Sequence, residues 1–173
     1  ALKRRPSSPT AQKAYFDALL HTGDFVAALD QFSRLKRTEV LGKEAPLVEA
    51  AVRLHAAMGE PPDNAAAALR QAQYAQKACL MFTPAALFRA STQLSLGKPG
   101  PAERTLSEFW HTCPRFDVFQ KWFDALIEAA PNLEEDKLLK RVEDLVKPKL
   151  RQPDEAGMAC LCMGTAALRL GKT

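Results

Sequence analysis

Apolar residues recur along most of the chain with the 3.6-residue period of an amphipathic helix. The strongest stripe begins at Phe119 and continues through Trp122, Phe123 and Leu126. No stretch shows the period-two alternation of a half-buried strand as clearly. The pattern predicts an all-α fold of about nine helices, at approximately 9–22, 24–36, 45–58, 63–82, 84–96, 100–113, 116–130, 134–147 and 154–170.

Residues that favour helix ends separate these stretches. Gly23, Gly59, Gly97 and Gly171 recur at multiples of about 37 residues, and we expect each to be left-handed just past a helix end. The sequence Thr22-Gly23-Asp24 adds an Asp N-cap for the next helix, which predicts a tight helix hairpin. Thr83-Pro84 is a second start signal, and we expect the helix before Pro148 to end at that proline.

The glycine spacing predicts a repeat of helix pairs. Short connections make neighbouring helices antiparallel, and each pair buries its apolar stripe on the next. We therefore expect a single-domain α-solenoid with repeats at approximately 8–42, 43–83, 84–115, 116–150 and an incomplete 151–173. The last helix is apolar on two faces, so we expect neighbours on both sides, with its next partner after Gly171.

Several of these positions resemble tetratricopeptide repeats. Gly97 is followed five residues later by Ala102, Pro114 closes the second helix, and Gly164 and Gly171 lie seven apart. A narrower resemblance covers almost the whole chain. The run 8–35 and the segments 110–118 (WHTCPRFDV), 138–145 (LLKRVEDL) and 153–171 (PDEAGMACLCMGTAALRLG) are similar in order and spacing to the C-terminal half of HemY-type proteins.

This resemblance implies a right-handed tetratricopeptide superhelix and a role in haem or porphyrin metabolism with no assigned chemistry. HemY-type proteins belong to the bacterial inner membrane and are encoded among haem-biosynthesis genes. The resemblance therefore implies a cytoplasmic domain whose membrane anchor precedes Ala1, where the sequence starts without a Met. Where such proteins often read Pro-His-Pro-Asp-Leu, residues 114–118 read Pro-Arg-Phe-Asp-Val, so a haem-ligating His is missing there.

Composition and charge exclude several classes of protein. Of the 173 residues 47% are apolar and 25% charged, which is ordinary for a globular protein. The longest uncharged stretch, 78–88, is broken by Pro84 and is too short to cross a bilayer. The net charge is only +4, and the basic residues are interspersed with acidic ones, so we expect no nucleic-acid partner. The four cysteines are expected to be free thiols.

No arrangement of side chains predicts an enzyme. His21, His55 and His111 fall on different repeats, and neither a zinc motif nor a catalytic triad is visible. Cys160 and Cys162 lie two apart on a helix and therefore point away from one another. We accordingly expect no metal site and no bound cofactor.

Two features leave alternatives open. Cys113-Pro114 is the dipeptide of haem-responsive regulatory motifs, so a haem or porphyrin carrier that uses Cys113 as iron ligand is the alternative function. The simpler interpretation makes Cys113 a small core residue. The basic run at 137–151 is either a solvated helix face or a surface that faces anionic lipid headgroups.

The remaining candidate site is the concave groove of the solenoid. Its expected lining comes from the first helix of each pair: Lys13, Asp17, His21, Glu49, Arg53, Ser91, Ser95, Thr165 and Arg169. Lys13 is paired with Asp17 where repeats that clamp a C-terminal carboxylate use Asn, so a chaperone tail is not expected. The sequence predicts a non-enzymatic scaffold that binds proteins through this groove, with haem-biosynthesis enzymes as candidate partners.

Overall fold

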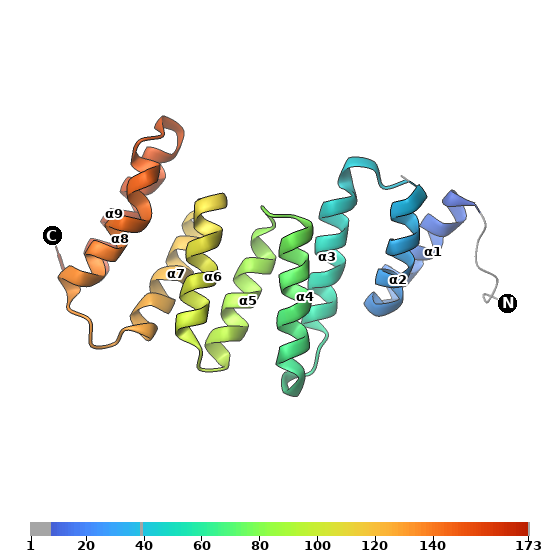
Figure 1. Ribbon diagram of the computed structural model, residues 1–173, viewed down its shortest axis with the longest axis horizontal. Coiled ribbons are helices and arrows are strands. Elements are labelled where there is room, and N and C mark those ends of the chain that lie inside the picture. The colour runs from blue at the N-terminus through green and yellow to red at the C-terminus, as the bar shows by residue number, and fades with distance from the viewer. Residues whose placement is uncertain (1–7, 39, 173) are drawn as a thin grey trace. The chain divides into compact units, whose positions relative to one another are not determined.

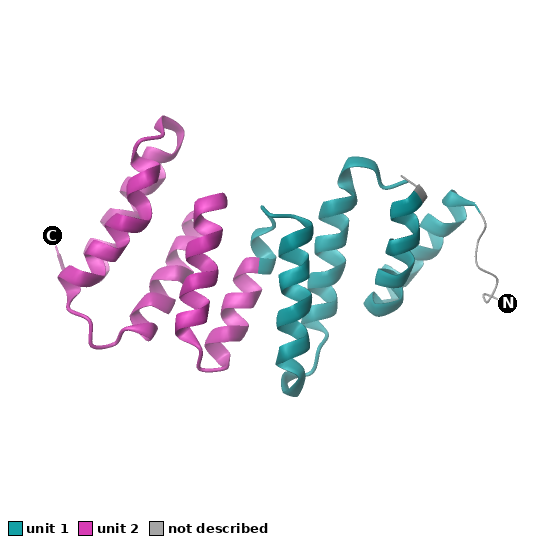
Figure 2. Ribbon diagram, viewed as in Figure 1, with its two compact units in different colours: residues 1–85 teal, residues 86–173 magenta. Residues whose placement is uncertain are grey.

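The computed structural model describes residues 8–38 and 40–172 and is all-helical there. These residues form nine α-helices and three short 3-10 helices, and they contain no strand (Figure 1). The all-α class and the number of helices are therefore confirmed. The chain divides into two compact units, Ala1–Ala85 and Ala86–Thr173, and the boundary falls inside one helix, α5 (Thr83–Ser95) (Figure 2).

Unit 1 holds the first four helices. They are α1 (Pro9–Thr22), α2 (Phe25–Leu35), α3 (Ala45–Met58) and α4 (Ala65–Ala78), with 3-10 turns at Lys36–Thr38, Gly42–Glu44 and Pro62–Asn64. Gly23 has φ 74° and ends α1, and the Asp24 side chain accepts a hydrogen bond from the Ala27 N–H at 3.0 Å. Both features confirm the predicted helix end at Gly23 and the predicted N-cap at Asp24. Phe16 and Phe32 then pack together in the core of α1, α2 and α3, with ring centroids 6.3 Å apart.

The contact between α3 and α4 is made of small side chains. All three buried residues of α4 are alanines, at 68, 72 and 75, and α3, against which α4 packs, also buries Ala50 and Ala57. Alanine at a helix contact lets two backbones approach closely, because only a methyl group separates them. The distance between α3 and α4 is therefore set by the smallest side chain with a Cβ.

Unit 2 holds the larger core. Its helices are the remainder of α5, α6 (Pro99–Thr112), α7 (Phe116–Ala129), α8 (Glu135–Leu150) and α9 (Pro153–Arg169). The predicted stripe of α7 packs on α6. The ring of Phe119 has its centroid 5.9 Å from Trp110, 5.8 Å from Trp122 and 6.0 Å from Phe123. Aromatic side chains bury the most apolar area per residue, so this group dominates the packing of unit 2.

A buried lysine joins three helices of unit 2. Lys149, in the last turn of α8, is 8% exposed. Its Nζ donates to the carbonyl of His111 at the end of α6 at 3.2 Å, and lies 3.0 Å from Oε2 of Glu155 in the first turn of α9. The end of α6 and the start of α9 are thus held by one ammonium group.

Three expectations at helix ends are wrong: the left-handed conformation of Gly59, the bounds of the helix at 63–82 and the stop at Pro148. Gly59 has φ −82° and is not left-handed. The N–H groups of Gly59 and Glu60 donate to the carbonyls of His55 and Ala57, so the last turn of α3 is closed without a left-handed residue. The helix predicted at 63–82 starts as a 3-10 turn, and α4 ends at Ala78.

The two helices predicted on either side of residue 83 are separated by a turn, and the one predicted proline stop, at Pro148, is absent. Residues 79–82 form a turn in which the Phe82 N–H donates to the Cys79 carbonyl at 3.0 Å, and α5 then starts at Thr83 with Pro84 in its first turn. Pro148 does not end its helix, since α8 runs on to Leu150. The contacts of Lys149 hold this last turn in place despite the proline.

Candidate functional site

The nine predicted groove residues fall in both units. Those of unit 1 are Lys13, Asp17, His21, Glu49 and Arg53, and those of unit 2 are Ser91, Ser95, Thr165 and Arg169. On α1, the Lys13 ammonium lies 2.9 Å from the Asp17 carboxylate, and both side chains are about half exposed. An exposed pair of this kind adds little stability and no net charge. His21 is exposed one turn further along.

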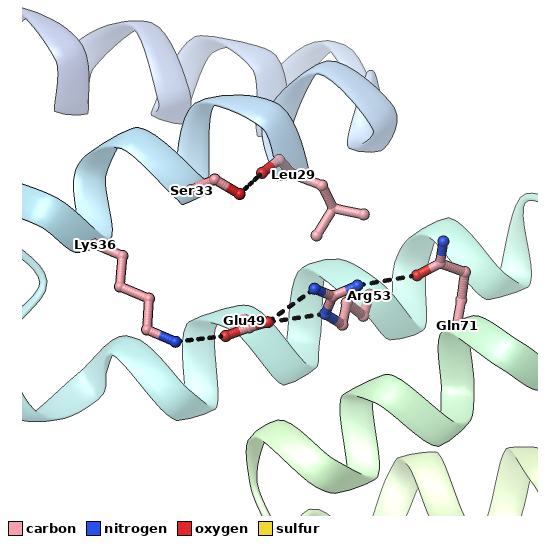
Figure 3. Close-up of polar contacts among 6 residues, drawn as sticks. All are labelled: Leu29, Ser33, Lys36, Glu49, Arg53 and Gln71. Carbon is pink, nitrogen blue, oxygen red and sulfur yellow. Dashed lines mark hydrogen bonds and ion pairs between the residues drawn. The ribbon is translucent and has the colours of Figure 1, made fainter.

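The residues predicted on α3 lie in a tighter network. The guanidinium of Arg53 donates to Glu49 Oε1 from Nε at 3.0 Å and from Nη2 at 2.9 Å, and from Nη1 to Gln71 Oε1 on α4 at 3.3 Å (Figure 3). Lys36 Nζ lies 3.4 Å from the other oxygen of Glu49. Three hydrogen bonds in fixed directions leave the planar Arg53 side chain one orientation.

An exposed aromatic ring lies next to this arginine. Tyr74 on α4 is 48% exposed, with the Arg53 guanidinium 5.3 Å and the Lys77 ammonium 5.9 Å from the centre of its ring. Both distances suit a cation–π contact. Lys36, Glu49, Arg53, Gln71, Tyr74 and Lys77 are named the Arg53–Tyr74 surface below.

The charges of the Arg53–Tyr74 surface do not cancel. It contains three cations, Lys36, Arg53 and Lys77, and one carboxylate, Glu49, which is only 16% exposed and faces two of the cations. Fixed cations beside a half-exposed aromatic ring suit a ligand with both a carboxylate and an apolar group, as an acidic peptide segment has.

Sequence reasoning missed four members of this surface. Lys36, Gln71, Tyr74 and Lys77 belong to the second helices of their predicted pairs or to the turn after them, which were not counted as groove positions. The signal that could have found three of them is spacing, because Gln71, Tyr74 and Lys77 recur every three residues and share a face of α4.

The groove residues of unit 2 mostly bond to their own helix. The Ser95 hydroxyl donates to the Thr92 carbonyl and the Thr165 hydroxyl to the Leu161 carbonyl, both at 2.8 Å, and Ser91 is exposed. Arg169 is held against α7, where Nη2 donates to Asp124 Oδ1 at 2.8 Å and the guanidinium lies 4.9 Å from the centre of the Phe123 ring.

Unit 2 also has a pocket of about 250 Å³ between α6, α7 and α8. Its lining is Glu103, Ser107, His111, Trp122, Arg141, Asp144 and Leu145. The Glu103 carboxylate accepts a hydrogen bond from Trp122 Nε1 at 2.9 Å and lies 3.6 Å from Arg141. Its charge is therefore already balanced within the protein.

Cys113 is not among the residues that line the pocket at Glu103 or the hollow beside Pro114. It is half-buried against the unit 2 core, and its N–H donates to the Phe109 carbonyl at 2.9 Å. The neighbouring hollow is lined by Pro114, Arg115, Phe116, Asp117 and Met158. A hydrogen bond from Arg115 lowers the pKa of the Asp117 carboxyl, so the charged groups there pair with each other.

The two cysteines of α9 point in different directions, as their spacing predicts. Cys160 is exposed, whereas Cys162 is buried, and burial raises the pKa of the Cys162 thiol to about 12. Within residues 8–38 and 40–172, no group of three or more His, Cys, Asp or Glu side chains is placed to hold a metal ion. In the same part of the chain, none of the helices has both the length and the apolar composition that a membrane span requires.

Comparison of the chain with models of protein families, with curated proteins and with solved structures finds no match.

Proposed function

We propose that this chain is a non-enzymatic protein-interaction scaffold, an α-solenoid of antiparallel helix pairs of the tetratricopeptide kind. It binds its partner in unit 1, where the Arg53–Tyr74 surface takes an extended segment that carries a carboxylate. The observation that supports this proposal is the network that fixes the Arg53 guanidinium beside a half-exposed Tyr74.

Preorganisation makes this surface suited to binding. The Arg53 side chain is 26% exposed and already restrained by Glu49 and Gln71, so a partner loses little of its binding energy to ordering it. Tyr and Arg are also the residues most often found at energetic centres of protein interfaces. Truncation of both side chains is therefore expected to cost at least about 2 kcal/mol of binding free energy.

The proposed cellular role rests on the segments that resemble HemY-type proteins. In this proposal the chain is the cytoplasmic part of a HemY-type protein that is anchored in the bacterial inner membrane, and its partners are enzymes of haem biosynthesis. The segments 110–118, 138–145 and 153–171 support this assignment.

The test uses purified haem-biosynthesis enzymes, immobilised one at a time, with the chain in solution. We expect at least one enzyme to bind the wild type, and the double variant Arg53→Ala/Tyr74→Ala to raise its Kd about thirtyfold or more. The matched control is Arg34→Ala, which removes an arginine from an exposed ion pair with Asp30 on α2. Equal binding by the double variant would contradict the assigned surface, and binding to none of the enzymes would contradict the assigned partners.

The haem-carrier alternative is tested in the same preparation. Ferric haem is titrated into the wild type and into Cys113→Ala, and the absorbance spectra are compared. Identical spectra remove Cys113 as a ligand, as its half-buried position leads us to expect.

A further inference from the structure

The outer side of α9 is an uncharged helix face. No charged residue occurs between Glu155 and Arg169. One side of α9 packs into unit 2 through Ala159, Cys162 and Ala166. The opposite side is exposed and carries a stripe with helical spacing, which we name the outer face of α9: Gly157, Leu161, Gly164 and Leu168.

The described residues do not cover the outer face of α9. Leu161 is 52% and Leu168 is 70% exposed. A Cβ added to Gly157 or to Gly164 would meet nothing within 4 Å. Glycine is the poorest helix former after proline, so two exposed glycines inside one helix weaken it unless another backbone needs the space. A helix that is apolar all round is typical of one covered on both sides.

The outer face of α9 is complementary to itself. Leu161 and Gly164 lie at equal distances from the point between residues 162 and 163, and so do Gly157 and Leu168. If two copies of α9 pack antiparallel about a two-fold axis at that point, each Leu161 meets Gly164 of the second copy. Each Leu168 then meets Gly157 of the second copy. Every large side chain thus faces the space left by a glycine.

The charges at the two ends of α9 favour the same orientation. Asp154 lies one turn before Gly157 on the same stripe, and Lys172, whose half-exposed ammonium lies 3.1 Å from Asp136 at the start of α8, follows the far end of the helix. Antiparallel packing places Asp154 close to Lys172 of the second copy, whereas parallel packing would put like charges together. Antiparallel helices also align their dipoles favourably.

We propose that the outer face of α9 is a homodimer interface, in which it packs antiparallel on the same face of a second copy of this chain. The 17 residues of α9 span about 25 Å, and one helix pair of this length buries less than a standard protein interface. The dimer is therefore weak and reversible, with a Kd on the order of 10 to 100 μM.

The first test is analytical ultracentrifugation of the full chain from about 5 to about 500 μM, a range that brackets the proposed Kd. We expect the wild type to pass from monomer to dimer, and Leu161→Glu/Leu168→Glu to remain a monomer throughout. The matched control is Leu80→Glu/Met81→Glu, which adds the same charges at two exposed apolar residues of unit 1 and should still dimerise. If the wild type is still monomeric at the highest concentration, the proposal is overturned. The outer face of α9 would then be covered by another protein or by a further helix.

A second variant separates dimerisation from folding. Gly164→Ala adds one methyl group in open space within the monomer, so it should raise the melting temperature of the monomer because alanine favours helix. In the dimer the same methyl group collides with Leu161 of the second copy, so we expect the Kd to rise about tenfold or more. An unchanged Kd would overturn the proposal.

Cross-linking tests the orientation in a Cys160→Ser background. Leu168→Cys mixed with Gly157→Cys should form a disulfide-linked dimer on mild oxidation, because the two positions meet in the antiparallel pair. Leu168→Cys alone should form none, since two copies of residue 168 lie well apart along the axis. A disulfide from Leu168→Cys alone indicates parallel packing and overturns the proposal. None of these results depends on the partner proposed for unit 1.

Discussion

The buried ammonium of Lys149 should make a large contribution to the stability of unit 2. Lys149→Met keeps a flexible apolar stem of similar length and removes only the charged donor. The His111 carbonyl then loses a hydrogen bond of 3.2 Å, and Glu155 Oε2 loses a cation at 3.0 Å. Glu155 Oε2 is itself buried and accepts no hydrogen bond from the described residues, so nothing replaces that cation.

The size of the effect follows from these distances. Unit charges 3.0 Å apart attract by about 1.4 kcal/mol at the dielectric constant of water and about 5.5 kcal/mol at a constant of 20. The cost of burying both charges offsets part of this attraction, whereas removal of one partner leaves the other charge unpaired at a cost of about 3–5 kcal/mol in a fully buried pair. We therefore expect Lys149→Met to lower the free energy of unfolding of unit 2 by about 3 kcal/mol.

The sequence supplies a selective probe. Both tryptophans, Trp110 and Trp122, lie in unit 2, and both tyrosines, Tyr15 and Tyr74, lie in unit 1. Tryptophan emission in a urea titration therefore reports the unfolding of unit 2.

The control is Lys147→Met, an exposed lysine in the same turn, for which we expect a change within about 0.5 kcal/mol. In the double variant Lys149→Met/Glu155→Gln, no buried charge is left unpaired, so about 1 kcal/mol should be recovered. Equal effects of the two single Lys→Met substitutions would refute the reasoning.

Two further predictions concern one side chain in each unit. Burial raises the pKa of the Cys162 thiol from 9.0 to about 12, so above pH 9 the unfolded chain loses this proton while the folded chain keeps it. The stability from this thiol is complete below pH 9 and should fall by about 1.4 kcal/mol per pH unit above it, a slope that urea titrations of Cys162→Ala should lack. In unit 1, Asp24→Ala removes the hydrogen bond to the Ala27 N–H and should cost about 1 kcal/mol by tyrosine-monitored unfolding, with Asp30→Ala as the exposed control on the same helix. An Asp24→Ala effect no larger than that of Asp30→Ala would argue against the N-cap.

Local sequence patterns predicted most helix positions, because apolar period and capping residues act over a few residues. Gly23 and Asp24 lie where these rules expect helix ends, and α1 and α3 have the predicted bounds. The wrong prediction at Pro148 has a cause in tertiary structure. Contacts with α6 and α9 keep the last turn of α8 helical, and these are absent from the local pattern.

The candidate site was only partly predictable for a related reason. Glu49 and Arg53 lie four residues apart on one helix, so their spacing alone indicates that they can pair. Gln71 and Tyr74 come to Arg53 from a different helix, and their approach depends on how α4 is rotated against α3. A single helix pattern shows which face is apolar but not which polar residues at its border meet a neighbour.

The alanine contact between α3 and α4 has a consequence for how this chain could change its partner. Every natural substitution at Ala68, Ala72 or Ala75 other than glycine adds volume between two closely packed helices, so those positions tolerate little variation. Tyr74 and Lys77 lie on the same helix outside that contact, whereas Gln71 bonds to Arg53 across it. Substitutions at Tyr74 and Lys77 could therefore change the ligand preference of the proposed binding surface while the spacing that positions Arg53 stays constant.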